Sequence, residues 1–339
     1  MINLDSIKLS IPADCIKEIK TDKMIQIISG KNGNLISKKH VLYDAREKNK
    51  QIGLNNITFD EIHNKLYVDI SAKILLADYG KLINLNTIEN VFANINKNNV
   101  VMLHPNIAID EAKTYNFDVT NDLHVDRKIS DYIDMLSTYE INEKYRPDIY
   151  EKESVKFIRN VKSYNETLRI YDKEKDMMQA KNERMRQYVS PGAYQNILRV
   201  ESMFNSHKRI KEIFDIQKQN NDVDFILLDV LKSDKKINYE MLNRVVAPVE
   251  QLSLFNPYPA GRIAWNIIRK KEGDKQIAKS CNYDIRIIKS YMRKYLSGNI
   301  SRYVREMKQT IKEMRDNERN KKKDDYYLLD EIKEKLKVA

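Results

Sequence analysis

Cysteine, glycine and proline are all scarce in this chain of 339 residues. Its two cysteines, Cys15 and Cys281, are too few for a disulfide framework or for a zinc site built from cysteines. Only eight glycines and seven prolines occur, and no segment reads GxGxxG or GxxxxGK followed by Ser or Thr. These absences argue against a nucleotide-driven motor and against a dinucleotide-dependent enzyme.

Long apolar runs are also missing. No run approaches the ~20 residues that a membrane helix needs. The N-terminal residues 1–12 alternate like a strand and lack the apolar core of a signal peptide. With 32% charged and 42% hydrophobic residues, the composition suits a soluble globular protein. We therefore expect a cytoplasmic protein without a membrane partner.

Positive charge is concentrated at the C-terminal end. The formal net charge is +11, and residues 261–339 hold 22 Lys and Arg against 12 Asp and Glu. Such a concentration favours a polyanionic partner, of which nucleic acid is the commonest. The alternative is a solvated basic helical tail.

The hydrophobic pattern predicts an α+β protein. Strands are predicted at residues 66–70, 117–125, 167–171 and 197–203, and a helix at 129–136. Beyond Phe204 the pattern is mainly helical, with segments at 208–218, 225–231 and 239–246. We divide the chain into a strand-rich domain at 1–215 and a basic helical region at 216–339.

Residues 117–125 alternate with unusual regularity. Apolar side chains occupy one face of this strand, and Asn121 is the only polar residue among them. Asp122 and His124 lie side by side on the other face, so both can reach one cation. The alternative is that this pair lies on the surface and has no functional role.

Two further strands carry polar faces. Arg199 and Glu201 share one face of the strand at 197–203, where Glu201 can add an oxygen ligand suited to Mg²⁺ or Mn²⁺. The alternative is a solvent-facing ion pair. Arg169, Tyr171 and Lys173 project together from the strand at 167–171. A tyrosine can attack a phosphodiester, and a nearby lysine can lower the pKa of the phenol or bind the phosphate oxygens.

These segments carry a family resemblance. Residues 1–12, Val119–Val125, Leu168–Lys173 and Leu198–Glu201 follow the order seen in replication proteins of the filamentous-phage gene II/X family, which the chain resembles over roughly Met1–Phe204. The Arg-x-Tyr-x-Lys and Arg-x-Glu strands are also similar to those of staphylococcal rolling-circle plasmid initiators. The resemblance implies an antiparallel-sheet, HUH-like nicking endonuclease domain over residues 1–215.

The resemblance also implies residue roles. Tyr171 corresponds to the nucleophile, Lys173 to the lysine beside it, and Asp122 and Glu201 to acidic ligands of Mg²⁺ or Mn²⁺. The ligand role of His124 rests on strand geometry alone. The chain differs from the family pattern at Thr120, which occupies the position of an arginine. Asp176 occupies a position where the family tends to have glutamate, and it is a possible further ligand. Arg169 and Arg199 are expected to contact DNA.

The implied reaction is rolling-circle initiation by nicking and rejoining of one DNA strand. A 5′-phosphotyrosine forms and a 3′-hydroxyl is released, without ATP. Single-stranded or supercoiled origin DNA is the expected substrate, in a bacterial host cell whose helicase and polymerase are expected partners. The alternatives are a DNA-binding replication or transcription regulator without cleavage activity, and a mobilisation relaxase.

Residues 273–296 resemble a helix-turn-helix in their pattern. Ile285, Ile288 and Met292 form an apolar stripe on the second predicted helix. Its outward cations are expected to contact DNA, and they are Arg286, Lys289, Arg293 and Lys294. The alternative is an amphipathic helix packed on the catalytic domain. Three aromatic residues are candidates for stacking on unpaired bases, namely Trp265, Tyr291 and Tyr295.

Overall fold

The computed structural model divides into two compact units. The described residues are 2–31, 34–43, 50–139, 141–142, 144–150, 152–161, 164–204, 207–214, 225–246, 269, 273–275, 277–278, 281, 283–296 and 298–339. The first unit holds Met1–Val246 and Glu331–Ala339, and the second holds Ala247–Asp330. The first unit thus continues past residue 215, where the sequence analysis placed a domain boundary.

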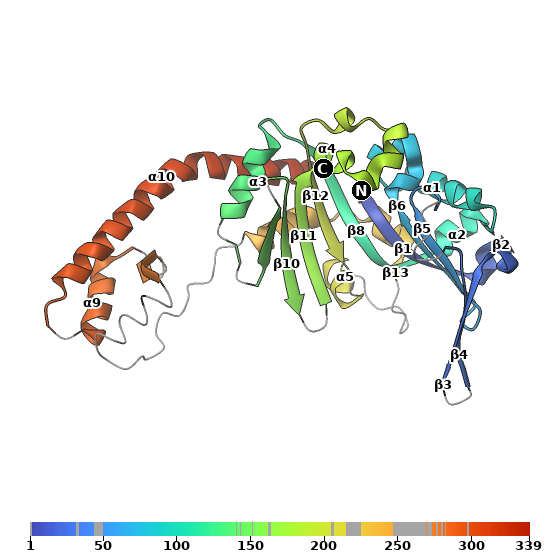
Figure 1. The fold of residues 1–339 in the computed structure, drawn as a ribbon, viewed down its shortest axis with the longest axis horizontal. Helices are drawn as coiled ribbons and strands as arrows, with labels where there is room; N and C mark the ends of the chain where they lie inside the picture. The colour runs from blue at the N-terminus through green and yellow to red at the C-terminus, as the bar shows by residue number, and fades with distance from the viewer. Residues whose placement is uncertain are drawn as a thin grey trace. The chain divides into compact units, whose positions relative to one another are not determined.

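An eleven-stranded antiparallel sheet is the framework of the first unit (Figure 1). Its strands run in the order β3-β4-β5-β6-β1-β8-β12-β11-β10-β9, and β13 pairs with β8. A second sheet pairs β2 with β7. The strands are β1 (Leu4–Pro12), β2 (Ile16–Ile19), β3 (Ile25–Lys31), β4 (Asn34–Val41), β5 (Leu54–Asp60), β6 (Lys65–Ser71), β7 (Val101–Leu103), β8 (Lys113–His124), β9 (Arg146–Tyr150), β10 (Ser154–Val161), β11 (Tyr164–Asp172), β12 (Ile197–Phe204) and β13 (Phe225–Ile226).

Short helices occupy the connections between these strands. The α-helices of this unit are α1 (Ile88–Ile95), α2 (Pro105–Glu111), α3 (Ile129–Thr138), α4 (Lys173–Met178), α5 (His207–Phe214), α6 (Leu227–Lys232) and α7 (Ile237–Val245). The 3-10 helices are η1 (Ala13–Cys15), η2 (Thr21–Lys23), η3 (Ala72–Lys81), η4 (Asn96–Asn98), η5 (Ala180–Gln187) and η6 (Pro191–Tyr194).

One face of β8 and β12 packs against α7. Asn121, the polar residue on the apolar face of β8, has a hydrogen-bond partner in this helix. The Asn238 side chain of α7 is buried and donates to the Asn121 side chain at 2.7 Å. It also donates to the backbone oxygens of Val119 and Val200, and it accepts from the Ser202 hydroxyl. Asn238 therefore satisfies a cluster of polar groups within this buried layer.

The opposite face of the same strands carries the polar side chains. Elements η3, α4, η5 and η6 supply the residues that contact them, and Figure 1 shows α4 near one end of β12. Two covering elements contact each other through Tyr79 of η3 and Tyr194 of η6, whose rings meet edge to face at 6.1 Å. Arg199 and Glu201 of β12 are buried beneath these elements.

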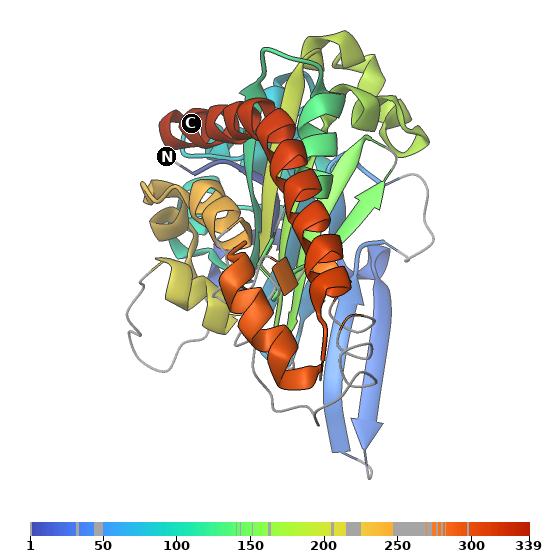
Figure 2. The ribbon, with the colours of Figure 1, turned by 90° about the vertical axis from the view of Figure 1, so that its left-hand side faces the viewer.

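The second unit contains α9 (Ile285–Tyr295) and the start of α10 (Ser301–Val338), whose last residues belong to the first unit. The absence of glycine and proline from residues 301–338 is consistent with a helix of 38 residues. The charge cluster at residues 316–325 is part of this helix. Figure 2 shows α9 (orange) beside the first part of α10 (red).

The predicted fold class is confirmed: an α+β protein with a large antiparallel sheet and a mainly helical C-terminal region. The strand predicted at 117–125 is β8, and the helix predicted at 129–136 is α3. Among the described residues, no helix combines the length and apolar character that a membrane crossing requires.

Candidate active site

Strand register brings three predicted site residues into one row across the sheet. Tyr171 of β11 lies opposite Arg199 of β12, and Arg199 lies opposite Asp122 of β8. The adjacent row places Arg169 opposite Glu201. Directly opposed residues of antiparallel strands share a face, so these side chains come from segments far apart in sequence and meet on one surface.

Arg199 is the centre of this group. Its side chain is fully buried, and its Nε and Nη2 donate to the two carboxylate oxygens of Asp122 at 2.6 and 2.7 Å. Nη1 donates to Asp5 at 2.9 Å and to the Tyr79 hydroxyl at 3.0 Å. This burial contradicts the expectation that Arg199 contacts DNA. The guanidinium instead neutralises two carboxylates that would otherwise repel each other.

Sequence reasoning missed Asp5 and Tyr79. Asp5 sits at an irregularity in the pairing of β1 with β8, which falls between Leu4 and Ser6. The pKa of Asp5 would rise on burial, but Arg199 and Lys173 hold it below its ordinary value. Burial and the charge of Asp5 raise the pKa of Tyr79 well above 10. An irregularity of this kind has no signature in the alternation of residues 1–12.

Tyr171 and Glu201 form the most direct contact in the site. The Tyr171 hydroxyl donates to Glu201 Oε1 at 2.6 Å, and both side chains are buried. Burial and the charge of Asp5 raise the pKa of Glu201 to about 7. Burial and the charge of Glu201 raise the pKa of Tyr171 well above 10. In the described conformation these effects leave the pKa of the phenol above its ordinary value despite the nearby ammonium of Lys173.

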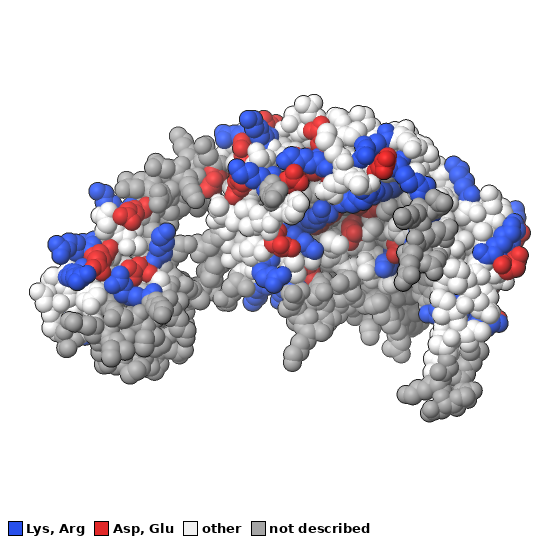
Figure 3. All heavy atoms as spheres, viewed as in Figure 1, with Lys and Arg blue, Asp and Glu red and all other residues white. Residues whose placement is uncertain are grey.

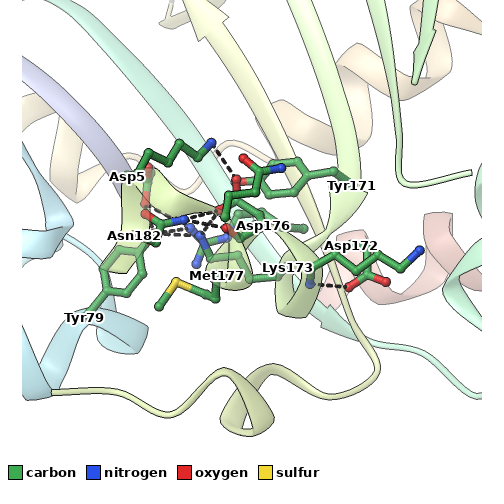
Figure 4. A network of polar contacts seen from close by, with 12 residues as sticks. Asp5, Tyr79, Tyr171, Asp172, Lys173, Asp176, Met177 and Asn182 are labelled. Carbon is green, nitrogen blue, oxygen red and sulfur yellow. Dashed lines mark hydrogen bonds and ion pairs between the residues drawn. The ribbon is translucent and has the colours of Figure 1, made fainter. Parts of the chain in front are cut away.

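Lys173 begins α4, is buried and joins the network around Arg199, because both side chains donate to the Tyr79 hydroxyl. Figure 4 shows this network close by. The Lys173 ammonium donates to the Tyr79 hydroxyl at 2.7 Å and to Asp176 at 3.0 Å, and Lys181 lies 2.7 Å from the other oxygen of Asp176. Burial and Arg199 lower the pKa of Lys173. Its ammonium and Lys181 hold the pKa of Asp176 below its ordinary value although burial opposes this.

The predicted metal ligands are not gathered into one cluster. Both oxygens of Asp122 accept from Arg199, Glu201 accepts from Tyr171, and His124 is exposed at the end of β8. In the described part of the chain, no group of three His, Cys, Asp or Glu residues is placed to hold a metal ion. This donor set does not fit a divalent cation in the described conformation, because its carboxylates are already engaged.

Thr120 takes the position where the family pattern has an arginine. It lies opposite Glu201 and is fully buried, and its hydroxyl has no hydrogen-bond partner among the described residues. Asp122 receives its guanidinium from Arg199 on the neighbouring strand instead. Arg199 is thus a bidentate cationic partner of Asp122.

A small cavity of about 120 Å³ opens beside Tyr171. The guanidinium of Arg169 lies 4.0 Å from the centre of the Tyr171 ring, and Arg169 is partly exposed. Its Nη1 lies 3.9 Å from Glu201, so it is a cation close to the Tyr171–Glu201 pair. The cavity is lined by Tyr150, Glu153, Ser154, Arg169, Tyr171, Asp172, Lys175, Asp176 and Gln179.

The second unit contains the other predicted DNA contacts. Ile288 and Met292 of α9 are buried, and the four predicted cations of this helix lie at or near the surface. Tyr291 and Tyr295 are buried as well, so the expectation that they stack on bases is wrong. Trp265 lies outside the described residues. Of the first predicted helix, the described residues 273–275 and 277–278 are helical.

Comparisons with solved structures find matches to the chain, one of which is a replication initiator. Its description is "Structure of Rolling Circle Replication Initiator Protein from Geobacillus stearothermophilus". It is 12% identical, the match covers 79% of this chain and 95% of that chain, and the TM-score is 0.34. No protein-family model matches the chain, and no curated protein sequence matches it.

Proposed function

We propose that the chain is a rolling-circle replication initiator that nicks and rejoins one DNA strand through Tyr171. The hydrogen bond of 2.6 Å between Tyr171 and Glu201, with Arg169 beside it, is the observation that carries this proposal. Tyr171 and Arg169 line one cavity, and Glu201 accepts a hydrogen bond from the Tyr171 hydroxyl, so a phenol, a cation and a carboxylate are close together, as attack on a phosphodiester requires. The resemblance to the gene II/X family supports the same assignment.

Glu201 acts as the general base. Its pKa of about 7 lets it be ionised and still accept a proton at neutral pH. The Tyr171 oxygen attacks phosphorus while its proton passes to Glu201. The bond from phosphorus to the 3′-oxygen breaks, and that oxygen takes up, through water, the proton that Glu201 has accepted. A 5′-phosphotyrosine and a free 3′-hydroxyl result, and the reverse reaction rejoins the strand.

Arg169 pairs with the phosphate during this step. It lines the cavity beside Tyr171 and retains partial exposure, whereas Arg199 and Lys173 are buried. Only 4% of Tyr171 is exposed, so substrate binding has to displace side chains at this cavity before the phosphate reaches the hydroxyl. Arg199 and Lys173 are positioning residues that hold the strands and α4 in place. A requirement for Mg²⁺ or Mn²⁺ remains a prediction of the resemblance, and no step is assigned to the ion.

A mobilisation relaxase would use the same chemistry, and a regulator would bind DNA without cleaving it. The cavity beside the Tyr171–Glu201 pair, with Arg169 in its lining, favours the enzyme over the regulator. The distinction between replication and mobilisation depends on the biological setting of the nicked sequence.

Formation of a covalent adduct tests the proposal. The protein is incubated with a single-stranded library of random sequence and with supercoiled DNA, each with and without Mn²⁺, and denaturing gels detect protein bound to DNA. We expect an adduct with the wild type and none with Tyr171→Phe. Tyr164→Phe is the matched control and should retain the adduct. An adduct that persists in Tyr171→Phe would assign the nucleophile to another tyrosine.

A further inference from the structure

A basic hollow lies between α9 and α10 within the second unit. It has a volume of about 350 Å³. Four cations line it, two from each helix, together with two apolar side chains and one hydroxyl, and no carboxylate lines it. The lining residues are Lys289, Arg293, Ile300, Ser301, Val304, Arg305 and Lys308.

The cations continue along α10. A second hollow shares Arg305 and Lys308 with the first and adds Lys312, although Glu306 and Glu313 line it as well. Positions 305, 308 and 312 fall on one face of a helix, and they span about 10 Å along its axis. Their row therefore has the reach to contact more than one phosphate of a DNA strand.

A buried core holds the two helices together, so these cations are held by a packed scaffold. Ile288 and Met292 of α9 pack in one cluster with Val304, Met307 and Ile311 of α10. Tyr295 is part of the same cluster, and its ring meets that of Tyr291 at 5.0 Å. The tyrosines that seemed available for base stacking in the sequence thus fix the geometry of the basic hollow.

The four lining cations have no carboxylate partner in the described part of the second unit, unlike the nearby arginines. Arg286 pairs with Asp284 at 2.8 Å, and Arg302 pairs with Glu306 at 3.0 Å. On the face shown in Figure 3, blue and red side chains are interleaved over this unit. The hollow therefore differs from the surface around it in that its cations have no acidic partner there. Their charge is available to an external anion.

We propose that this α9–α10 hollow binds the phosphate backbone of duplex DNA. No aromatic residue lines it, which favours backbone contacts over stacking on unpaired bases. Arg305 and Lys308 thereby join Lys289 and Arg293 as DNA contacts, while Arg286 is engaged with Asp284. The proposal shares its partner with the proposed function but does not require that the chain cleave DNA.

The test compares two double variants of the full chain. Arg305→Gln with Lys308→Gln removes two cations of the hollow, and Arg286→Gln with Arg302→Gln removes the same charge from cations that already have acidic partners. Binding to a fluorescent duplex of unrelated sequence is measured by anisotropy over a range of salt concentrations. We expect the hollow variant to bind more weakly and its slope of log K against log salt to fall by about 2. We expect the control to stay near the wild type.

Equal losses in both variants would show that net charge alone matters and would overturn the proposal. Unchanged binding in the hollow variant would overturn it as well. A larger loss on single-stranded than on duplex DNA would rule out the duplex backbone as the ligand. All four substituted residues are exposed, and thermal melting confirms that each variant is folded. Adduct formation on saturating single-stranded DNA should persist in both variants, so that failure of nicking and failure of the hollow are distinguishable.

Discussion

The Tyr171 hydroxyl and the Glu201 carboxyl share a hydrogen bond of 2.6 Å beside the guanidinium of Arg169. Burial shifts both groups toward their protonated forms. Glu201 is the only one of the two whose pKa lies near neutrality, at about 7, so it sets the pH at which the pair can release a proton. Adduct formation is therefore expected to depend on its ionisation.

The rate of adduct formation should rise as pH increases through about 7 and then level off, since Glu201 must be ionised to accept the Tyr171 proton. Single-turnover rates across this range measure the effect. Glu201→Gln should lower the rate by at least about 100-fold, as loss of a general base commonly does, and should remove this rise. A rise that persists in Glu201→Gln would assign the titration to another group.

Glu201 should also make stability depend on pH. Its pKa is raised from 4.5 in the unfolded chain to about 7 in the folded protein. Its contribution to the free energy of unfolding is complete below 4.5 and declines as pH rises toward 7, by an amount on the order of 3 kcal/mol. Urea unfolding of wild type and Glu201→Gln measures the difference between the two curves. The two proteins have to be compared because burial also raises the pKa of Asp118, to about 6. Asp118 is present in both, so the difference between their curves reports on Glu201. A constant difference between pH 4.5 and 7 would contradict the assignment.

Replacing Arg199 should destabilise the fold strongly. Arg199→Met leaves Asp122 and Asp5 without their shared guanidinium, and the loss of one partner of a buried ion pair costs roughly 3 kcal/mol or more. Urea unfolding measures the change. Lys81→Met is the matched control, because Lys81 pairs with Asp78 on the surface and should change stability little. Comparable effects of the two substitutions would refute the central role of Arg199.

Asn238 of α7 should be needed for stability, because it bonds to polar groups on the face of the sheet opposite Arg199. Asn238→Leu removes the partners of Asn121 and Ser202 within a buried layer. Unsatisfied buried polar groups cost about 1–3 kcal/mol each, so the free energy of unfolding should fall by at least that much. Asn55 of β5, whose side chain donates to Asp69 near the surface, is the matched control. Asn55→Leu should cost less than about 1 kcal/mol.

His124 should be dispensable for the dependence on Mn²⁺, if adduct formation shows one. It is exposed and lies outside the network around Arg199, whereas Glu201 contacts Tyr171. Adduct yield over a range of Mn²⁺ concentrations is compared between wild type and His124→Ala, and the midpoint should not shift. A large shift toward higher Mn²⁺ would restore His124 as a ligand and show that the described conformation rearranges when the ion binds.

The alternation of polar and apolar residues was sufficient to predict which face of β8, β11 and β12 carries the site. It placed Tyr171, Glu201 and Asp122 on polar faces, because side chains in a strand alternate with a period of two. It could not predict that Arg199 would be buried. Burial depends on η3 and α4 covering the sheet, and on Asp5 reaching across from β1 at a pairing irregularity.

In the second unit as well, the pattern of one segment does not show which neighbouring elements bury its side chains. The spacing of Ile288 and Met292 identifies the buried face of α9, but it does not show that Tyr291 and Tyr295 are buried as well. Their burial depends on α10, whose Val304 and Met307 complete the cluster. A pattern within one helix cannot show which neighbour widens its buried face.

Mass spectrometry of the trapped adduct tests the central claim most directly. The complex formed on single-stranded DNA is digested with protease and nuclease, and the residue that carries the nucleotide remnant is identified by fragmentation. The account predicts a 5′-phosphonucleotide on the Tyr171 oxygen and on no other tyrosine. A remnant on a different residue, or a protein that binds DNA yet yields none, would contradict it.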